Sequence, residues 1–158
     1  MSTQGRNANI NGQRFEDVVS SVLEQTKQMK VVKYQEIKTQ LSSLDNVIIK
    51  NYPYTNYFGN TKARGDLYIK SGDKKIRIEC RCQNGPGTVT EKFPALFMNM
   101  SNMVENDVIA VVNGNGIDSR ALNWFKFQAQ QSNKDFKVFN FEEFKSWAIA
   151  SFGDNNEN

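Results

Sequence analysis

Residues 75–83, KIRIECRCQ, alternate between polar and apolar side chains. If this segment is a β-strand, neighbouring side chains point to opposite faces of a sheet. The polar face then carries a carboxylate, two guanidinium groups and an amide at spacings of roughly 6.5–7 Å. These groups belong to Arg77, Glu79, Arg81 and Gln83. The opposite face is small and apolar enough for a core, and it consists of Ile76, Ile78, Cys80 and Cys82.

Asp66 lies upstream, at the start of a second expected strand over residues 66–70. The intervening residues 71–74, SGDK, are typical of a hairpin turn. An antiparallel hairpin therefore brings Asp66 close to Glu79. Two carboxylates and a cation that converge on one strand pair are what a divalent-metal phosphodiesterase site requires.

The composition indicates a single globular domain. The chain has 158 residues, 39% of them hydrophobic, and a net charge of +3, which permits nucleic-acid binding without demanding it. We expect one domain over residues 1–158, with about 1–10 and 153–158 flexible. No apolar run approaches the roughly 18 residues of a membrane span, and the N-terminal MSTQGRNANING lacks the apolar region of a signal peptide. We therefore expect an intracellular, cytoplasmic protein.

The chain contains no histidine, which limits its chemistry. Serine–histidine–aspartate and cysteine–histidine catalysis are excluded, as are histidine general bases and histidine-centred metal nucleases. Cys80 and Cys82 are expected to be buried thiols, because an i, i+2 pair on a strand is poorly placed for a disulfide. Two cysteines without histidine also make a poor zinc site. Catalysis then depends on carboxylates, lysine or arginine, tyrosine, water and metal.

Apolar periodicity predicts an α/β fold. Strands are expected at residues 46–52, 66–70, 75–83, 107–112 and 136–139. Helices are expected from Asn11, at 34–41, from an N-cap at Thr90, at 118–131 and at 142–152. Three strands in a meander followed by crossover helices imply a mixed sheet flanked by helices, with 75–83 and 107–112 at its centre.

This order of elements resembles the PD-(D/E)XK nuclease superfamily, which has a helix with GxxFE, then an aspartate, then a strand with ExKxQ. The matching residues are Gly12, Phe15, Glu16, Asp66, Glu79 and Gln83. Residues 87–100, GTVTEKFPALFMNM, and the segments VVNGNG and FKVFNFEEFKSWA look like those of its restriction-endonuclease-like proteins. The resemblance spans about residues 9–150 and implies a restriction-endonuclease-like mixed β-sheet core flanked by helices.

The resemblance implies a Mg²⁺-dependent endonuclease that hydrolyses DNA phosphodiester bonds. Asp66, Glu79 and the backbone carbonyl of Cys80 are expected to hold Mg²⁺, or Mn²⁺ in its place. The ion would lower the pKa of a bound water and offset charge on the scissile phosphate. Glu16 is expected to join through a water or a second metal, and Gln83 to position a phosphate or a group near a base.

Two departures from the superfamily pattern bear on catalysis. Gly65 stands where proline is common, and Arg81 stands where lysine is usual. Arginine stays protonated, so Arg81 cannot be a general base. It is expected instead to orient the surroundings of the attacking water and to neutralise developing charge. Lys92 is expected to supply an ammonium group from a different direction.

Each candidate residue also has a purely structural interpretation. Asp66 suits the start of a strand after a glycine turn, and Glu79 suits an ion pair with a neighbouring arginine. Glu16 suits a solvated first helical turn, because the helix dipole favours a carboxylate there. Lys92 suits the exposed surface.

Residues 52–64 interleave aromatic rings with asparagine and basic side chains. Basic groups suit phosphates, whereas asparagine amides and aromatic rings suit base edges or stacking. We expect Tyr57, Asn60, Lys62 and Arg64 to contact DNA. A tyrosine-rich loop that covers the sheet edge is the alternative.

Three classes of function remain. The first is a metal-dependent DNA endonuclease of restriction, homing or Holliday-junction-resolving type. The second is a DNA-binding protein of the same fold whose catalysis has decayed, and the third is a small-molecule enzyme or partner-binding domain with the same acidic pocket. One site cuts one strand, so an enzyme that cuts both is expected to be a homodimer or higher oligomer. The aromatic residues Trp124, Phe125 and Phe127 suit either such an interface or the core.

Overall fold

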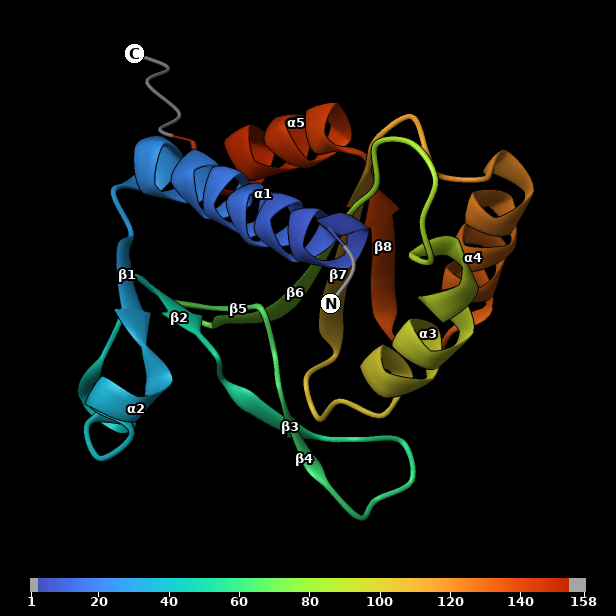
Figure 1. Cartoon of the computed structure of the whole chain (residues 1–158). Helices are drawn as coiled ribbons and strands as arrows, with labels where there is room; N and C mark the ends of the chain where they lie inside the picture. Colours follow the sequence, from blue (N-terminus) through green and yellow to red (C-terminus); the bar gives the residue numbers. More distant parts are fainter. Residues whose placement is uncertain (1–2, 154–158) are drawn as a thin grey trace.

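The computed structural model describes the backbone of residues 3–153 and the side chains of residues 14–153. Six strands in this part of the chain form one sheet: β1 (Lys30–Lys33), β2 (Val47–Lys50), β5 (Leu67–Ser71), β6 (Lys74–Cys82), β7 (Asp107–Asn113) and β8 (Asp135–Phe139). Their order is β1-β2-β5-β6-β7-β8 (Figure 1). β5 pairs antiparallel with β2 and β6, whereas the other neighbours are parallel. The expected mixed sheet is confirmed.

Helices cover both faces of this sheet (Figure 1). On one face lie α1 (Thr3–Lys27) and α5 (Phe141–Phe152), and on the other lie α3 (Phe93–Ser101) and α4 (Ser119–Gln131). The short helix α2 (Tyr34–Ile37) and two 3-10 turns, η1 (Leu41–Ser43) and η2 (Thr90–Lys92), complete the fold. Within residues 3–153, no helix is long and apolar enough to cross a membrane.

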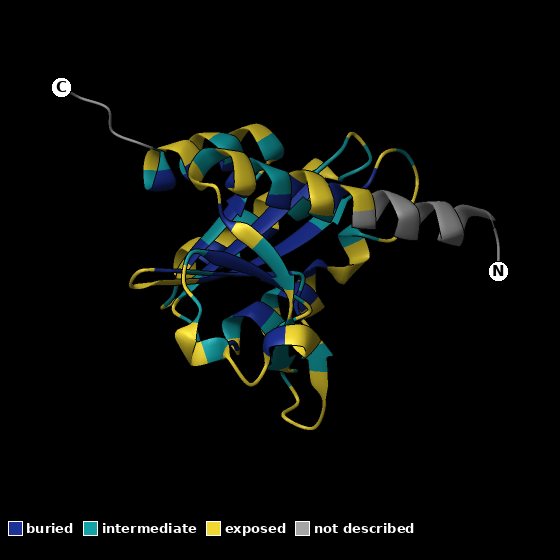
Figure 2. Cartoon of the chain, turned by 90° about the vertical axis from the view of Figure 1, so that its left-hand side faces the viewer, coloured by how far each residue is buried: buried dark blue, intermediate teal, exposed yellow. Residues whose placement is uncertain are grey.

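β6 lies between β5 and β7, so both of its edges are hydrogen-bonded. Its apolar side chains alternate as expected: Ile76, Ile78 and Cys80 are buried in the cluster beneath α1 and α5. Arg77 and Glu79 are also buried, but on the opposite face. Figure 2 shows the central strands as the most deeply buried part of the molecule.

A two-stranded ribbon, β3 (Pro53–Thr55) and β4 (Lys62–Arg64), projects from the body of the molecule (Figure 1). This segment was expected to be a loop. Two contacts hold its turn to α3: the Tyr57 N–H donates to Asn99 Oδ1 at 3.0 Å, and Asn102 Nδ2 donates to the Asn56 carbonyl at 3.3 Å.

Several element boundaries differ from the expected ones. α1 begins at Thr3 rather than near Asn11, and β1 was not anticipated. The helix expected at 34–41 divides into α2 and η1. Thr90 begins η2 instead of capping α3, whose N-cap is Lys92 without a side-chain hydrogen bond. Residues 1–2 and 154–158, which belong to the two ends expected to be flexible, lie outside the described residues.

Candidate active site

The β5–β6 hairpin places Asp66 against Glu79, as the sequence predicted. Gly72 makes the tight turn with a φ of +57°, a conformation that favours glycine. The resulting register pairs Leu67 with Ile78, so the residues that follow this pair outward are Asp66 and Glu79. The Asp66 N–H donates to Glu79 Oε2 at 2.9 Å, and the Cys80 N–H donates to Asp66 Oδ2 at 2.8 Å.

Glu79 is more deeply buried than Asp66, with 2% of its surface exposed. Burial raises its pKa well above the usual range, and the charge of Asp66 raises it further. A carboxylate in such a place is costly unless a cation or a proton neutralises it. The pair is therefore a site that favours positive charge.

Arg81 supplies a cation to this site from within the chain. Its Nη1 donates to Asp66 Oδ2 at 3.0 Å and to the carbonyl oxygen of Cys80 at 2.8 Å. Burial alone would lower the pKa of Arg81, but the charges of Asp66 and Glu79 raise it overall. One guanidinium nitrogen thus bridges two of the oxygen atoms that were expected to bind metal.

Arg77, the neighbouring arginine on the same face, has other partners. It donates from Nη1 to the Tyr52 carbonyl and from Nη2 to the Pro53 carbonyl, each at 2.7 Å. Its Nε lies 3.1 Å from Glu105 Oε2, a close ion pair that lacks hydrogen-bond geometry. Arg77 therefore anchors the base of the β3–β4 ribbon. The charge of Arg81 is the one that lowers the pKa of Glu79.

Glu16 is a half-buried residue of α1, and the charge of Asp66 affects its pKa. Burial, followed by the charge of Asp66, raises its pKa to about 7. The charge of Lys50, at the end of β2, opposes this shift. Lys50 also forms an ion pair with Asp17. Lys50 is a residue that the sequence reasoning missed, although it closes the apolar run of a predicted strand.

Gln83 is buried, and its amide connects two loops rather than facing open space. Its Nε2 donates to the carbonyls of Gly85 at 3.0 Å and Gly116 at 2.9 Å, while its Oε1 accepts from the Val89 N–H at 2.8 Å. Both amide hydrogens are therefore already used. In this structure Gln83 positions the loops beside the site.

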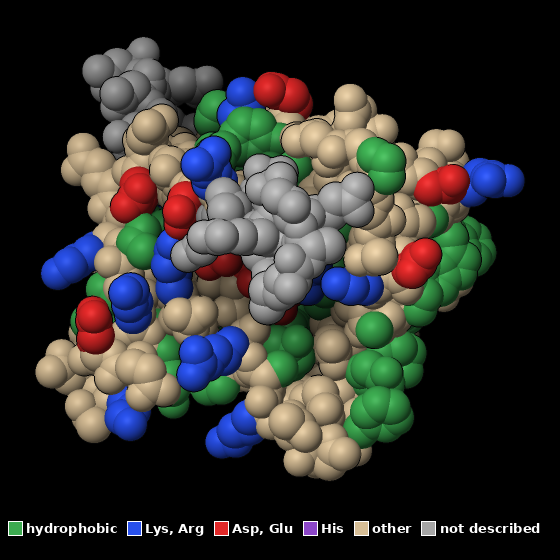
Figure 3. Space-filling view, viewed as in Figure 1, with side chains coloured by type: hydrophobic (Ala, Val, Ile, Leu, Met, Phe, Trp, Pro, Cys, Tyr) green, Lys and Arg blue, Asp and Glu red, His purple; other side chains and the backbone are tan. Residues whose placement is uncertain are grey.

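All but one of the remaining predicted residues are exposed. Lys92 is exposed on η2, and no ion pair or side-chain hydrogen bond within residues 14–153 joins it to the acidic pair. Asn60, Lys62 and Arg64 are exposed on the β3–β4 ribbon, and Tyr57 is half-buried beside its turn. On the face shown in Figure 3, lysine and arginine side chains are spread over the surface, with acidic side chains among them.

Two more residues lie near the acidic pair, Tyr54 and Gly65. Burial raises the pKa of Tyr54, on β3, and the charge of Glu79 raises it further. Gly65 donates its N–H to the Tyr52 carbonyl at 3.0 Å, and an added Cβ would approach that oxygen to 2.9 Å. Proline has no N–H to donate. This contact explains why glycine stands at position 65.

The oxygen atoms of the site suit a hard divalent cation, but Arg81 already contacts two of them. Asp66, Glu79 and the Cys80 carbonyl offer oxygen ligands of the kind that Mg²⁺ prefers. Arg81 already contacts two of these groups, so a metal ion between them requires its guanidinium to withdraw. Within the described part of the chain, no three acidic or cysteine side chains are grouped closely enough to share an ion.

Comparison with known families identifies the class of protein. The family model described as a PD-(D/E)XK nuclease superfamily domain matches residues 7–152. The chain therefore belongs to the PD-(D/E)XK nuclease superfamily, and its mixed sheet flanked by helices is consistent with that fold. No curated protein and no solved structure matches the chain.

Proposed function

We propose that this protein is a Mg²⁺-dependent DNA endonuclease of restriction-endonuclease type, which hydrolyses phosphodiester bonds at the Asp66–Glu79 pair. The observation that carries this proposal is the 2.9 Å contact between the Asp66 N–H and the buried Glu79 carboxylate, inside a PD-(D/E)XK nuclease superfamily domain. The unusual burial of Glu79 supports the same conclusion, because a structural role alone does not require a carboxylate there.

Asp66, Glu79 and the Cys80 carbonyl would hold Mg²⁺ or Mn²⁺ once Arg81 has withdrawn. When bound, such an ion lowers the pKa of a water and offsets negative charge on the phosphate. Glu16, whose pKa of about 7 lets it exchange a proton near neutral pH, accepts a proton from the attacking water. The displaced Arg81 guanidinium donates to the phosphate oxygens as charge develops.

The surface residues bind the rest of the substrate. Asn60, Lys62 and Arg64 on the ribbon contact DNA, with Tyr57 supporting the turn that presents them. Lys92 contacts a phosphate next to the cleaved one, and Gln83 holds the neighbouring loops in place for this contact. Residues 1–158 act as one domain, and the protein acts in the cytoplasm. Because one site cuts one strand, the active form is a homodimer or higher oligomer.

One observation favours a second candidate, a DNA-binding protein that has lost catalysis. Arg81 occupies the position between Asp66 and the Cys80 carbonyl that a metal ion would need. If the guanidinium stays there when DNA binds, the site binds phosphate without hydrolysing it. The two candidates share the same fold and the same DNA-binding surface, and they differ in whether Mg²⁺ produces cleavage.

Incubation with supercoiled plasmid and with a four-way DNA junction, in Mg²⁺ or in EDTA, distinguishes them. We expect the wild-type protein to cut in Mg²⁺ and Asp66→Asn to be inactive. Asp73→Asn, which removes an exposed carboxylate from the turn of the same hairpin, is the matched control and should cut normally. Preference for the junction would indicate a Holliday-junction-resolving enzyme.

Two results would change the proposal. Cleavage by Asp66→Asn at the wild-type rate would remove this residue from the active site. DNA binding without cleavage in either Mg²⁺ or Mn²⁺ would establish the second candidate.

A further inference from the structure

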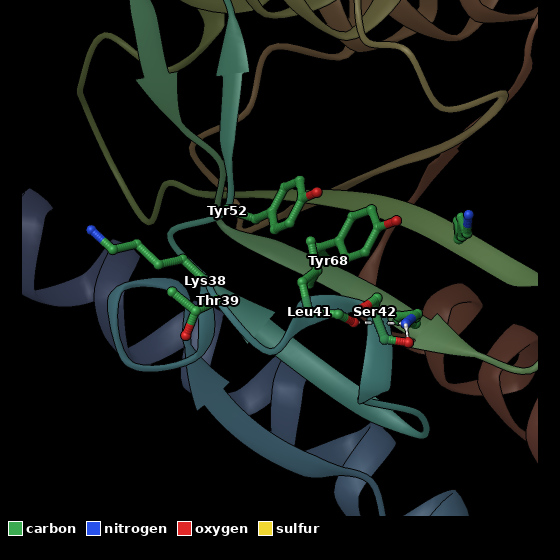
Figure 4. A pocket seen from close by; sticks show the side chains of 8 residues that line it. Lys38, Thr39, Leu41, Ser42, Tyr52 and Tyr68 are labelled. Carbon is green, nitrogen blue, oxygen red and sulfur yellow. Dashed lines mark hydrogen bonds between the residues drawn. The ribbon is translucent and has the colours of Figure 1, made fainter.

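A pocket of about 400 Å³ lies on the same face of the sheet as the acidic pair, at the opposite end of β5 and β6 (Figure 4). Tyr68, Lys70 and Lys75 of these two strands form one wall, and Lys38 and Ser42 are part of the wall formed by α2 and η1. None of the residues that line it is acidic. The pocket therefore concentrates positive charge.

Two of the lysines lie directly opposite each other on neighbouring strands, and this arrangement favours a bound anion. Lys70 and Lys75 are direct partners in the β5–β6 register. Like charges directly opposite each other destabilise a strand pair. Lys70 Nζ donates to the Leu41 carbonyl at 2.8 Å, but within residues 14–153 neither Lys75 nor Lys38 forms an ion pair. An anion near the paired Lys70 and Lys75 would offset their repulsion.

The β3–β4 ribbon separates this pocket from the acidic pair. Tyr52 lines the pocket, the ribbon begins at the next residue, and the chain returns from it to Asp66. Arg77 fixes the base of the ribbon through the carbonyls of Tyr52 and Pro53. In Figure 4 the two strands of the ribbon rise from beside Tyr52.

The distance along β6 between the acidic pair and the pocket is close to the width of the DNA major groove. Glu79 and Lys75 are separated by four steps along β6, or about 13 Å at roughly 3.3 Å per residue. The major groove of B-DNA is about 12 Å wide and admits a two-stranded β-ribbon. A ribbon that lies in this groove has one DNA backbone on each side.

We propose that the pocket binds backbone phosphates of the DNA strand opposite the one that the acidic pair cuts, with the β3–β4 ribbon in the major groove between them. This inference rests on the proposed DNA substrate and adds a second contact region to it. The pocket then fixes the duplex relative to the acidic pair and selects double-stranded over single-stranded DNA.

The test compares binding of a labelled duplex and of its single strands, in EDTA, over a range of salt concentrations. Lys38→Gln combined with Lys75→Gln should weaken duplex binding about tenfold at low salt. It should also reduce the slope of log affinity against log salt by about 0.9 for each lysine removed. Affinity for single strands should change less than about twofold, because they do not span the groove.

The matched control removes two lysines from other surfaces: Lys126→Gln on α4 and Lys145→Gln on α5. Equal weakening by this control, or equal weakening of duplex and single-strand binding by the pocket variant, would overturn the proposal. So would unchanged duplex binding, or a free mononucleotide that competes as effectively as the duplex. Binding is measured in EDTA, so it does not depend on cleavage. A protein that binds duplex as predicted but does not cut in Mg²⁺ would contradict the catalytic proposal and not this one.

Discussion

Arg81 gives the buried acidic pair a counter-ion of its own. A carboxylate removed from water is costly unless it is paired. Arg81 Nη1 pairs directly with Asp66 Oδ2, and the charge of Arg81 also lowers the pKa of Glu79, so part of this cost is offset without any metal. The contacts of Arg81 also compete with a metal ion for Asp66 and the Cys80 carbonyl. Metal affinity at this site should therefore depend on how readily the side chain at position 81 withdraws.

Replacing Arg81 with lysine should strengthen metal binding. An ammonium group is a point charge on a flexible stem and lacks the rigid fork of donors that holds the guanidinium in place. For Arg81→Lys, we expect the Mg²⁺ concentration that half-maximally raises the melting temperature to fall by about tenfold. Arg120→Lys, on the exposed surface of α4, is the control. A higher requirement for Mg²⁺ in Arg81→Lys would show that the guanidinium assists metal binding.

Glu16 should make stability depend on pH. Its pKa in the folded protein is raised from 4.5 to about 7, so the folded state holds its proton more tightly than the unfolded state. The stability that this provides is complete below pH 4.5 and is lost as the pH rises through about 7. Glu16→Gln removes the dependence.

In EDTA, we expect Glu16→Gln to match the wild-type melting temperature at pH 4.5 and to exceed it at pH 8 by about 2–4 °C. Partial exposure of Glu16 limits the effect through solvent screening. Thermal unfolding followed by circular dichroism at several pH values measures this difference. Glu24→Gln, exposed on the same helix, should show no such trend. A constant offset at all pH values would contradict the assignment.

Among the elements, those with strong alternation were predicted well and the short ones were not. β6 alternates apolar and polar residues over its whole length, and the turn residues before it specify the hairpin that brings Asp66 to Glu79. β1 has only two apolar residues, and the β3–β4 ribbon combines short strands with a turn rich in polar residues. Their strand conformation depends on pairing with distant segments, which local sequence does not reveal.

The two loops joined by Gln83 approach each other closely at their glycines. An added Cβ at Gly116 would lie 2.1 Å from the carbonyl oxygen of Gly85, so the loops must separate to accommodate it. We expect Gly116→Ala to lower the free energy of unfolding by about 2 kcal/mol, measured by denaturant titration. A change of less than about 0.5 kcal/mol, as for an ordinary surface substitution, would show that this packing is loose.

At the scale of the whole molecule, the aromatic residues of α4 have divided roles. Phe125 is fully buried in the core beneath α3 and α4, whereas Trp124 and Phe127 are exposed. The sequence left this division open because a helix stripe does not show which face meets the sheet. Light scattering in solution tests the expected homodimer, and a monomer that cuts both strands of a duplex would contradict it.

The sequence also placed the acidic pair correctly within the molecule, but not its surroundings. The strand pattern was sufficient to bring Asp66 and Glu79 together. The contacts of Arg81 and Gln83 depend on side-chain conformations and on loops from other parts of the chain. In the proposed mechanism Arg81 leaves these contacts before metal binds, so a measurement of cleavage in Mg²⁺ tests the account most directly.

That measurement is the single-turnover cleavage rate of a labelled DNA duplex in Mg²⁺, with enzyme in excess, for the wild-type protein and Glu79→Gln. Glutamine keeps the size of the side chain and an oxygen that can accept from the Asp66 N–H, but it removes the charge. We predict that Glu79→Gln cuts at least about 10²-fold more slowly, while its duplex affinity in EDTA stays within about twofold of wild type. Cleavage by Glu79→Gln at the wild-type rate would contradict the assignment of the Asp66–Glu79 pair as the catalytic centre.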